Sequence, residues 1–166
     1  MPPSLHLRPA TLADAPAMAA LLEHDPAAVE TTGRIRIPCT VEAARDWLAL
    51  VTGPAPDGGL SIACTIERGD GAFLGNIGCA GTLDEVEVGY WVGRPFWGQG
   101  VASRALALLI AEVRSRAVRR VKAETVSGNA GSEKVLLKAG FTFEADGFED
   151  NPLRGRRPIR SWGLAL

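Results

Sequence analysis

The stretch GYWVGRPFWGQGVASRALALLIAEV, residues 89–113, decides the fold. It opens as a strand, passes through a turn with glycines on both sides of Gln99, and continues as a long apolar helix. Such a unit can bind an anion, because the first backbone N–H groups of a helix have no partner within the helix. The glycines can equally serve to turn the chain, so residues 98–103 alone leave both interpretations open.

The rest of the sequence predicts a mixed α/β fold around one sheet. Three strands joined by short turns favour an antiparallel meander, and a strand after the glycine-turn helix implies a right-handed parallel crossover. The predicted strands are 5–8, 60–66, 72–80, 85–92, 121–126, one that begins at Phe141, and 159–166. The predicted helices are 17–22, 41–51, one that follows Gly100 with the apolar stripe Val101, Ala105, Leu108, Leu109 and Val113, and one from Gly128 or Asn129 to Gly140.

Size and charge limit the class of protein. A chain of 166 residues predicts a single domain over 1–166, and it has no apolar run of about 18 residues that would span a membrane. The N-terminus lacks the features of a signal peptide, so we expect a cytoplasmic protein. Lys and Arg number 18 and Asp and Glu 19, a balance that gives no reason to expect nucleic acid or a membrane surface as a partner.

The cysteines and histidines are scattered along the chain. Three cysteines and two histidines have neither the spacing of a zinc site nor that of a disulfide framework. We therefore expect no metal and no disulfide.

Several linked motifs resemble one enzyme family. They are Glu87-Val88-Gly89-Tyr90-Trp91-Val92, Phe96-Trp97-Gly98-Gln99-Gly100-Val101-Ala102, Asn129-x-x-Ser132, Lys138-Ala139-Gly140-Phe141 and the opening Leu7-Arg8-Pro9-Ala10-Thr11-x-x-Asp14. In this order and spacing they resemble the GNAT superfamily of acyl-CoA-dependent N-acyltransferases, and most closely its RimJ/RimL-like branch. The resemblance implies the GNAT fold, a mixed, mostly antiparallel sheet with flanking helices whose fourth and fifth strands splay apart.

The resemblance also implies acetyl-CoA as the co-substrate. In the family the backbone N–H groups of the glycine turn cradle the pyrophosphate, the pantetheine arm pairs with the fourth strand, and the asparagine at the start of the next helix contacts the cofactor. Trp97 stands where the family more often has Arg or Gln. Carried over, the cofactor-binding residues are Trp91, Val92, Trp97, Gly98, Gln99, Gly100, Val101, Ala102, Ser103, Asn129 and Ser132.

Two residues are candidates for catalysis. Glu87 matches the fourth-strand glutamate that serves some relatives as the base, directly or through water; it can equally be a surface carboxylate, and Glu85 is the obvious substitute. The tyrosine that assists thiolate departure in many members is replaced here by Leu136, and Tyr90 is the only tyrosine. In the RimL-like branch a serine takes that role, which points to Ser132; its alternative is an ordinary first-turn helix residue.

The expected function is transfer of an acetyl group from acetyl-CoA to a primary amine in a ternary complex. The acceptor is a protein N-terminus or a small amine, bound where the family builds its acceptor groove, at 31–38 and 148–157. Arg154, Arg156 and Arg157 there contact an acidic substrate or are simply solvated. The competing class is a non-catalytic acyl-CoA-binding regulatory module. A homodimer is common in this branch.

Overall fold

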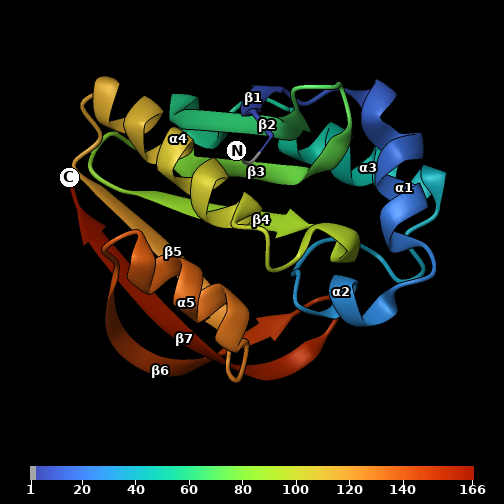
Figure 1. The fold of residues 1–166 in the computed structure, drawn as a ribbon. Coiled ribbons are helices and arrows are strands. Elements are labelled where there is room, and N and C mark those ends of the chain that lie inside the picture. Colours follow the sequence, from blue (N-terminus) through green and yellow to red (C-terminus); the bar gives the residue numbers. More distant parts are fainter. Residues whose placement is uncertain (1–2) are drawn as a thin grey trace.

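The computed structural model describes residues 3–166 and places seven strands in one sheet. The strand order is β1-β2-β3-β4-β5-β7-β6, so that β7 lies between β5 and the edge strand β6 (Figure 1). The strands are β1 Leu5–Pro9, β2 Leu60–Arg68, β3 Phe73–Gly81, β4 Val86–Val92, β5 Arg120–Val126, β6 Thr142–Asn151 and β7 Gly155–Ala165. The predicted antiparallel meander is confirmed, because β1 to β4 pair in sequence order.

Five α-helices flank the sheet, and side chains cap the starts of three. They are α1 Ala15–Leu22, α2 Pro26–Glu30, α3 Val41–Val51, α4 Val101–Ser115 and α5 Ala130–Lys138. The Thr40 hydroxyl accepts a hydrogen bond from the Ala43 N–H at 3.2 Å, so α3 starts where the sequence predicts. The short α2 was not predicted: Asp25 ends the preceding turn and then caps a new helix with proline in its first turn.

The predicted splay of the fourth and fifth strands is confirmed. β4 and β5 run parallel, but only three residue pairs are in register, Val86↔Val121, Glu87↔Lys122 and Val88↔Ala123. Both strands then continue without pairing to each other, β4 to Val92 and β5 to Val126. A gap therefore opens between two neighbouring strands inside the sheet.

The two faces of the sheet carry separate cores. On one face α4 and α5 pack over Val86 and Val88 of β4, and both helices are seen in front of the strands in Figure 1. On the other face α1 and α3 cover Trp91, whose ring lies 5.8 Å from that of Phe73. Because strand residues alternate between faces, Tyr90 belongs to the first face and Glu87 to the second.

Two details differ from the prediction. Leu108, assigned to the buried stripe of α4, is 43% exposed. The buried arc of the helix also includes Leu106 and Ile110, which moves its centre away from Leu108 and leaves that residue at the edge. Strand β6 also runs on to Asn151, beyond the segment that the sequence indicated.

Candidate active site

The gap between β4 and β5 begins at Gly89 and Glu124, the first positions after the last paired residues. A methyl group built on Gly89 would meet no atom within 4 Å. Gly89 has no positive φ, so the backbone does not require glycine there. Its missing side chain instead leaves open space on the Glu87 face, next to the point where the strands part.

The glycine turn ends at the start of α4, beside this gap. Gly98 and Gly100 have φ values of 74° and 72°, a left-handed conformation that favours glycine whether or not a ligand binds. The backbone N–H groups of the turn and of the first residues of α4 are more informative. Within residues 3–166, no backbone N–H from Gly98 to Ser103 donates a hydrogen bond to another group of the protein. Six neighbouring donors at the positive end of a 15-residue helix are thus available to an anion.

Two side chains, one just before the turn and one within it, fix its shape. The Trp97 indole donates to the Val92 carbonyl at 2.7 Å, and the Gln99 amide donates to the Pro95 carbonyl at 2.9 Å. The Arg94 guanidinium stacks 4.4 Å from the Trp97 ring centre and pairs with Asp25. Trp97 and Gln99 therefore hold the turn through their side chains, which leaves its backbone donors free.

The two strand residues expected to meet the pantetheine arm point to different edges of β4. The Gly93 N–H donates to the Leu74 carbonyl of β3 at 2.9 Å. Because backbone groups alternate along a strand, Trp91 also faces β3, whereas Tyr90 and Val92 face the gap. Of the two residues predicted to pair with the pantetheine arm, Trp91 and Val92, only Val92 has backbone groups that face the gap.

The start of α5 lies on the same face of the sheet as the turn. The Asn129 side chain accepts a hydrogen bond from the Ser132 N–H at 3.2 Å and caps the helix. The Ser132 hydroxyl lies 2.9 Å from the Tyr90 hydroxyl, which comes from β4. Burial raises the pKa of Tyr90, and the hydrogen bond with Ser132 offsets part of that rise. Leu136, where many relatives have tyrosine, is fully buried.

Glu87 lies on the opposite face and belongs to a charged cluster. Lys122 Nζ is 3.1 Å from a Glu87 carboxylate oxygen and 3.9 Å from one of Glu124. The hydrogen bond with Glu87 raises the pKa of Lys122. Burial and the neighbouring Glu87 raise the pKa of the Glu124 carboxyl. Glu85, the predicted substitute, is held by Arg120 at 2.9 Å and precedes β4.

The predicted base and the predicted acid therefore lie on opposite faces of the sheet. Glu87 is on the face of α1 and α3, and Ser132 is on the face of α4 and α5. Only a group that lies in the gap between β4 and β5 can face both Glu87 and Ser132. The gap is therefore the place where a molecule bound on one face of the sheet can meet a molecule that enters from the other face.

The two segments predicted to build the acceptor groove lie against each other. Arg157 of β7 donates to the Glu30 carbonyl at 2.6 Å and to the Thr32 carbonyl at 3.3 Å. The Asn151 amide donates to the Gly33 carbonyl at 3.0 Å. We call this set of contacts between residues 29–35 and the β6–β7 hairpin the hairpin latch.

The arginines of the hairpin play a part that the sequence did not predict. Arg154 donates to the backbone carbonyls of Val29 and Ile35, so Arg154 and Arg157 tether a neighbouring loop. Arg156 is the exposed one; it pairs with Asp150 and stacks on Phe148.

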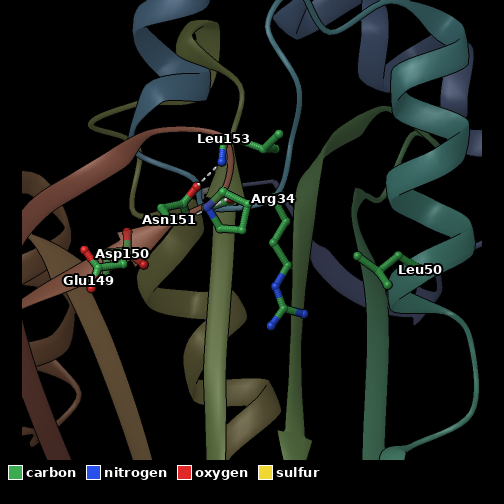
Figure 2. A pocket seen from close by; sticks show the side chains of 8 residues that line it. Arg34, Leu50, Glu149, Asp150, Asn151 and Leu153 are labelled. Carbon is green, nitrogen blue, oxygen red and sulfur yellow. Dashed lines mark hydrogen bonds between the residues drawn. The ribbon is translucent and has the colours of Figure 1, made fainter.

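A pocket of about 470 Å³ opens beside the hairpin latch (Figure 2). The carboxylates of Glu149 and Asp150 lie on one side, Leu50 on the other, and Arg34 between them. The remaining lining residues are Gly33, Asn151, Pro152 and Leu153.

Three contacts of the site were missed from the sequence. Lys122 and Glu124 share the face of Glu87 because β4 and β5 are parallel and in register. Aligning the two predicted strands, 85–92 and 121–126, in parallel could have indicated this contact. The contact between Tyr90 and Ser132 spans 42 positions and has no local signal. Over residues 3–166, the structure has no group of three or more His, Cys, Asp or Glu arranged to hold a metal, and no helix long and apolar enough to cross a membrane.

Comparison with known proteins identifies the family. The model of the acetyltransferase (GNAT) domain matches residues 4–142. No curated protein matches the chain. Among solved structures, RimJ of Mycobacterium smegmatis in complex with CoA-disulfide is 23% identical with a TM-score of 0.83, covering 98% of this chain and 82% of that one.

Two further structures cover almost the whole of both chains. Ribosomal-protein-alanine N-acetyltransferase of Brucella melitensis is 26% identical with a TM-score of 0.73, over 97% of this chain and 99% of that one. A GCN5-related N-acetyltransferase of Kribbella flavida is 22% identical with a TM-score of 0.72, over 98% of each chain. With the family model spanning most of its length, the chain belongs to the GNAT family of acetyl-CoA-dependent N-acetyltransferases, as its resemblance to the RimJ/RimL-like branch led us to expect.

Proposed function

We propose that residues 1–166 form one acetyltransferase domain that moves the acetyl group of acetyl-CoA to a primary amine by direct attack in a ternary complex. The observation that carries this proposal is that two features meet inside the sheet, where β4 and β5 part. Six backbone donors from Gly98 to Ser103, which lack protein partners among residues 3–166, lead into α4 on one face, and the gap between β4 and β5 connects that face with the other.

The residues present fit coenzyme A. The donors of Gly98 to Ser103 suit a pyrophosphate, because a helix N-terminus favours negative charge and glycine allows close approach. Tyr90 and the Val92 N–H offer strand-edge groups for the amides of a pantetheine arm, whereas the Val92 carbonyl already accepts from the Trp97 indole. Acetyl-CoA supplies the activated thioester. Asn129, already the cap of α5, is placed to border the same site.

Glu87 and Ser132 are the proposed catalytic residues. Glu87 accepts the proton that the amine loses, directly or through water, and Lys122 balances the negative charge of the cluster. Ser132 donates a hydrogen bond to the departing thiolate from the opposite face. Glu85 is less suited to the role of base, because it lies two residues further from the start of the gap than Glu87; both carboxylates are paired, with Arg120 and with Lys122 respectively.

The acceptor is a protein N-terminus or a small amine. The Brucella relative, named a ribosomal-protein-alanine N-acetyltransferase, supports the first. The pocket beside the hairpin latch favours neither kind of acceptor by its charge, because Arg157 and Arg156 pair with its carboxylates Glu149 and Asp150, and Arg34 lies between them and Leu50. Three free cysteines suit the reducing cytoplasm, where we place the protein.

Calorimetric titration with acetyl-CoA, free CoA and dephospho-CoA tests the proposal. We expect saturable binding of acetyl-CoA, followed by transfer to N-terminal peptides or small amines in an acetylation assay. Binding without transfer to any amine would favour the non-catalytic acyl-CoA-binding module. Absence of binding in a folded, cofactor-free sample would remove the function altogether. Light scattering on the same sample tests the expected homodimer.

Two variants test the residue roles. We expect Glu87→Gln to lower kcat by about a hundredfold, the usual range for a general base, and Ser132→Ala to lower it by about tenfold. Acetyl-CoA affinity should stay within a factor of about two in Glu87→Gln, since Glu87 lies on the face opposite the donors. Unchanged transfer in both variants would contradict the assigned roles.

A further inference from the structure

The only tyrosine of the chain contacts the helix that lacks the family's tyrosine. Tyr90 comes from β4 and Ser132 from the first turn of α5, 42 positions later. Their hydroxyl oxygens are 2.9 Å apart, a normal hydrogen-bond distance. The Ser132 carbonyl is a more distant acceptor at 3.4 Å.

Which hydroxyl donates depends on what else Ser132 contacts. A serine hydroxyl has one proton and two lone pairs, and so does a phenol. If a negative charge develops on the far side of Ser132, the serine proton turns toward that charge. The bond between the two hydroxyls then persists only if Tyr90 is its donor. Burial is compatible with this direction, because it raises the pKa of Tyr90 and the phenol therefore keeps the proton that it donates.

We propose that Tyr90 is a positioning residue for thiolate departure: its hydroxyl donates to Ser132 Oγ and leaves the Ser132 proton free to stabilise the departing sulfur. This inference rests on the proposed function, in which Ser132 faces the sulfur. A hydroxyl that accepts one hydrogen bond becomes a better donor of its own, because chained hydrogen bonds polarise one another. Tyr90 thus strengthens a serine that is a weak acid by itself.

The chemistry balances without a proton leaving Tyr90. The amine nitrogen forms a bond to the acetyl carbon, the carbon–sulfur bond breaks, and its electron pair stays on sulfur. The amine proton passes to Glu87 or water. A thiol has a pKa near 8.5 and a phenol near 10, so the thiolate is too weak a base to take the phenolic proton. The pair therefore acts by hydrogen bonding to the thiolate.

A purely structural role for Tyr90 predicts something different. Partly buried hydroxyl groups find partners in most proteins, and loss of this bond would then lower stability without affecting the sulfur. The pKa of the thiol of bound CoA distinguishes the two roles. This pKa can be measured from the ultraviolet absorbance of the thiolate. If the pair stabilises thiolate, removing the phenolic hydroxyl raises that pKa by about half a unit to one unit.

The first experiment compares wild type, Tyr90→Phe, Ser132→Ala and the double variant. We expect Tyr90→Phe to lower kcat about three- to tenfold, with the KM for acetyl-CoA nearly unchanged and the thiol pKa of bound CoA raised. In the Ser132→Ala background, Tyr90→Phe should cost nothing further. The inference would be overturned if the losses of kcat in the two single variants multiplied in the double variant, or if Tyr90→Phe left the thiol pKa of bound CoA unchanged.

The control is Thr52→Val, which removes a hydroxyl that donates to the Leu48 carbonyl at 2.7 Å, at the end of α3. It should leave kcat and the thiol pKa unchanged. A wild-type protein that binds no CoA would refute the proposed function itself. A wild-type protein that binds CoA and transfers acetyl groups, with Tyr90→Phe indistinguishable from it, would refute only the inference.

A second measurement keeps the phenol in place. Because Tyr90 is the only tyrosine, fluorotyrosines incorporated during expression alter this residue alone. A more acidic phenol donates more strongly, so the thiol pKa of bound CoA should fall steadily across the series, measured below the pKa of each phenol. A flat series would overturn the inference even if Tyr90→Phe were too unstable to study.

Discussion

Asp14 shows at the scale of one residue how neighbours stabilise a buried charge. Its carboxylate pairs with Arg8 at 2.6 Å, accepts from the Thr65 hydroxyl at 2.8 Å and from the Thr11 N–H at 3.0 Å. Burial alone would raise the pKa of Asp14, but these hydrogen bonds outweigh it and the pKa lies below its ordinary value. Thr11 and Asp14 have the three-residue spacing of a capping box, a local signal, whereas the contact of Asp14 with Thr65 depends on the pairing of β1 with β2.

Asp14→Asn should therefore destabilise the protein by about 3 kcal/mol at neutral pH, since it leaves Arg8 without its most buried partner. A lowered folded-state pKa means that this contribution is present above about pH 4 and is lost as the pH falls through the folded-state value. Denaturant unfolding of both proteins across pH should show the difference shrinking in acid. Asp57→Asn, at an exposed carboxylate, should give no such difference. A constant difference across pH would contradict the assignment.

Lys122 offers a second test at this scale. It is the cation nearest to Glu87 and Glu124, and a carboxylate that loses a nearby cation is harder to ionise. Lys122→Met should move the acid limb of the pH dependence of kcat/KM upward, because Lys122 lowers the pKa of the Glu124 carboxyl in the same cluster. Lys138→Met, on the exposed end of α5, should leave the profile in place. If the pH profile of Lys122→Met does not shift, the charged cluster of Glu87, Lys122 and Glu124 takes no part in the reaction.

At the scale of elements, the sequence predicts best where a local signal exists. Helix α3 begins after Thr40 because that hydroxyl caps it, and four residues of sequence suffice to indicate this. Strand β6 was only partly predicted, because its residues 144–150 are mostly acidic and exposed. It is held by the strand opposite: Asp146, Glu149 and Asp150 lie across from Arg160, Arg157 and Arg156, and each pair forms an ion pair.

The glycine turn allows its structural and functional roles to be separated. Gly100 and Gly71 both have positive φ, 72° and 87°, and a methyl group at either would meet no atom within 4 Å. Gly100→Ala and Gly71→Ala should thus each cost about 1 kcal/mol of stability through backbone strain alone. Only Gly100→Ala should weaken CoA binding, by roughly tenfold, because it shifts the donors of α4. Thermal unfolding and calorimetry measure both; equal CoA affinity in the two variants would mean that the turn holds no anion.

At the scale of the whole molecule, the sequence placed the two candidate catalytic residues on known elements but not relative to each other. Glu87 and Ser132 lie on opposite faces, and this follows only from the three-residue register of β4 and β5 and from the packing of α5. Register depends on contacts between distant segments, which a single sequence does not encode locally. The hairpin latch was unpredictable for the same reason, since Arg157 reaches carbonyls more than 120 positions away.

The hairpin latch provides the last prediction, which concerns how distant segments shape the acceptor side. Arg157→Ala removes the donors to the Glu30 and Thr32 carbonyls, so the loop at 30–35 should open more often. We expect faster amide exchange in that loop and a KM for the amine acceptor raised roughly fivefold, with acetyl-CoA affinity unchanged. Arg156→Ala is the matched control, because Arg156 is exposed and its bond to Asp150 is 3.5 Å long. If both variants behave alike, or if Arg157→Ala weakens acetyl-CoA instead, the hairpin latch does not shape the acceptor groove.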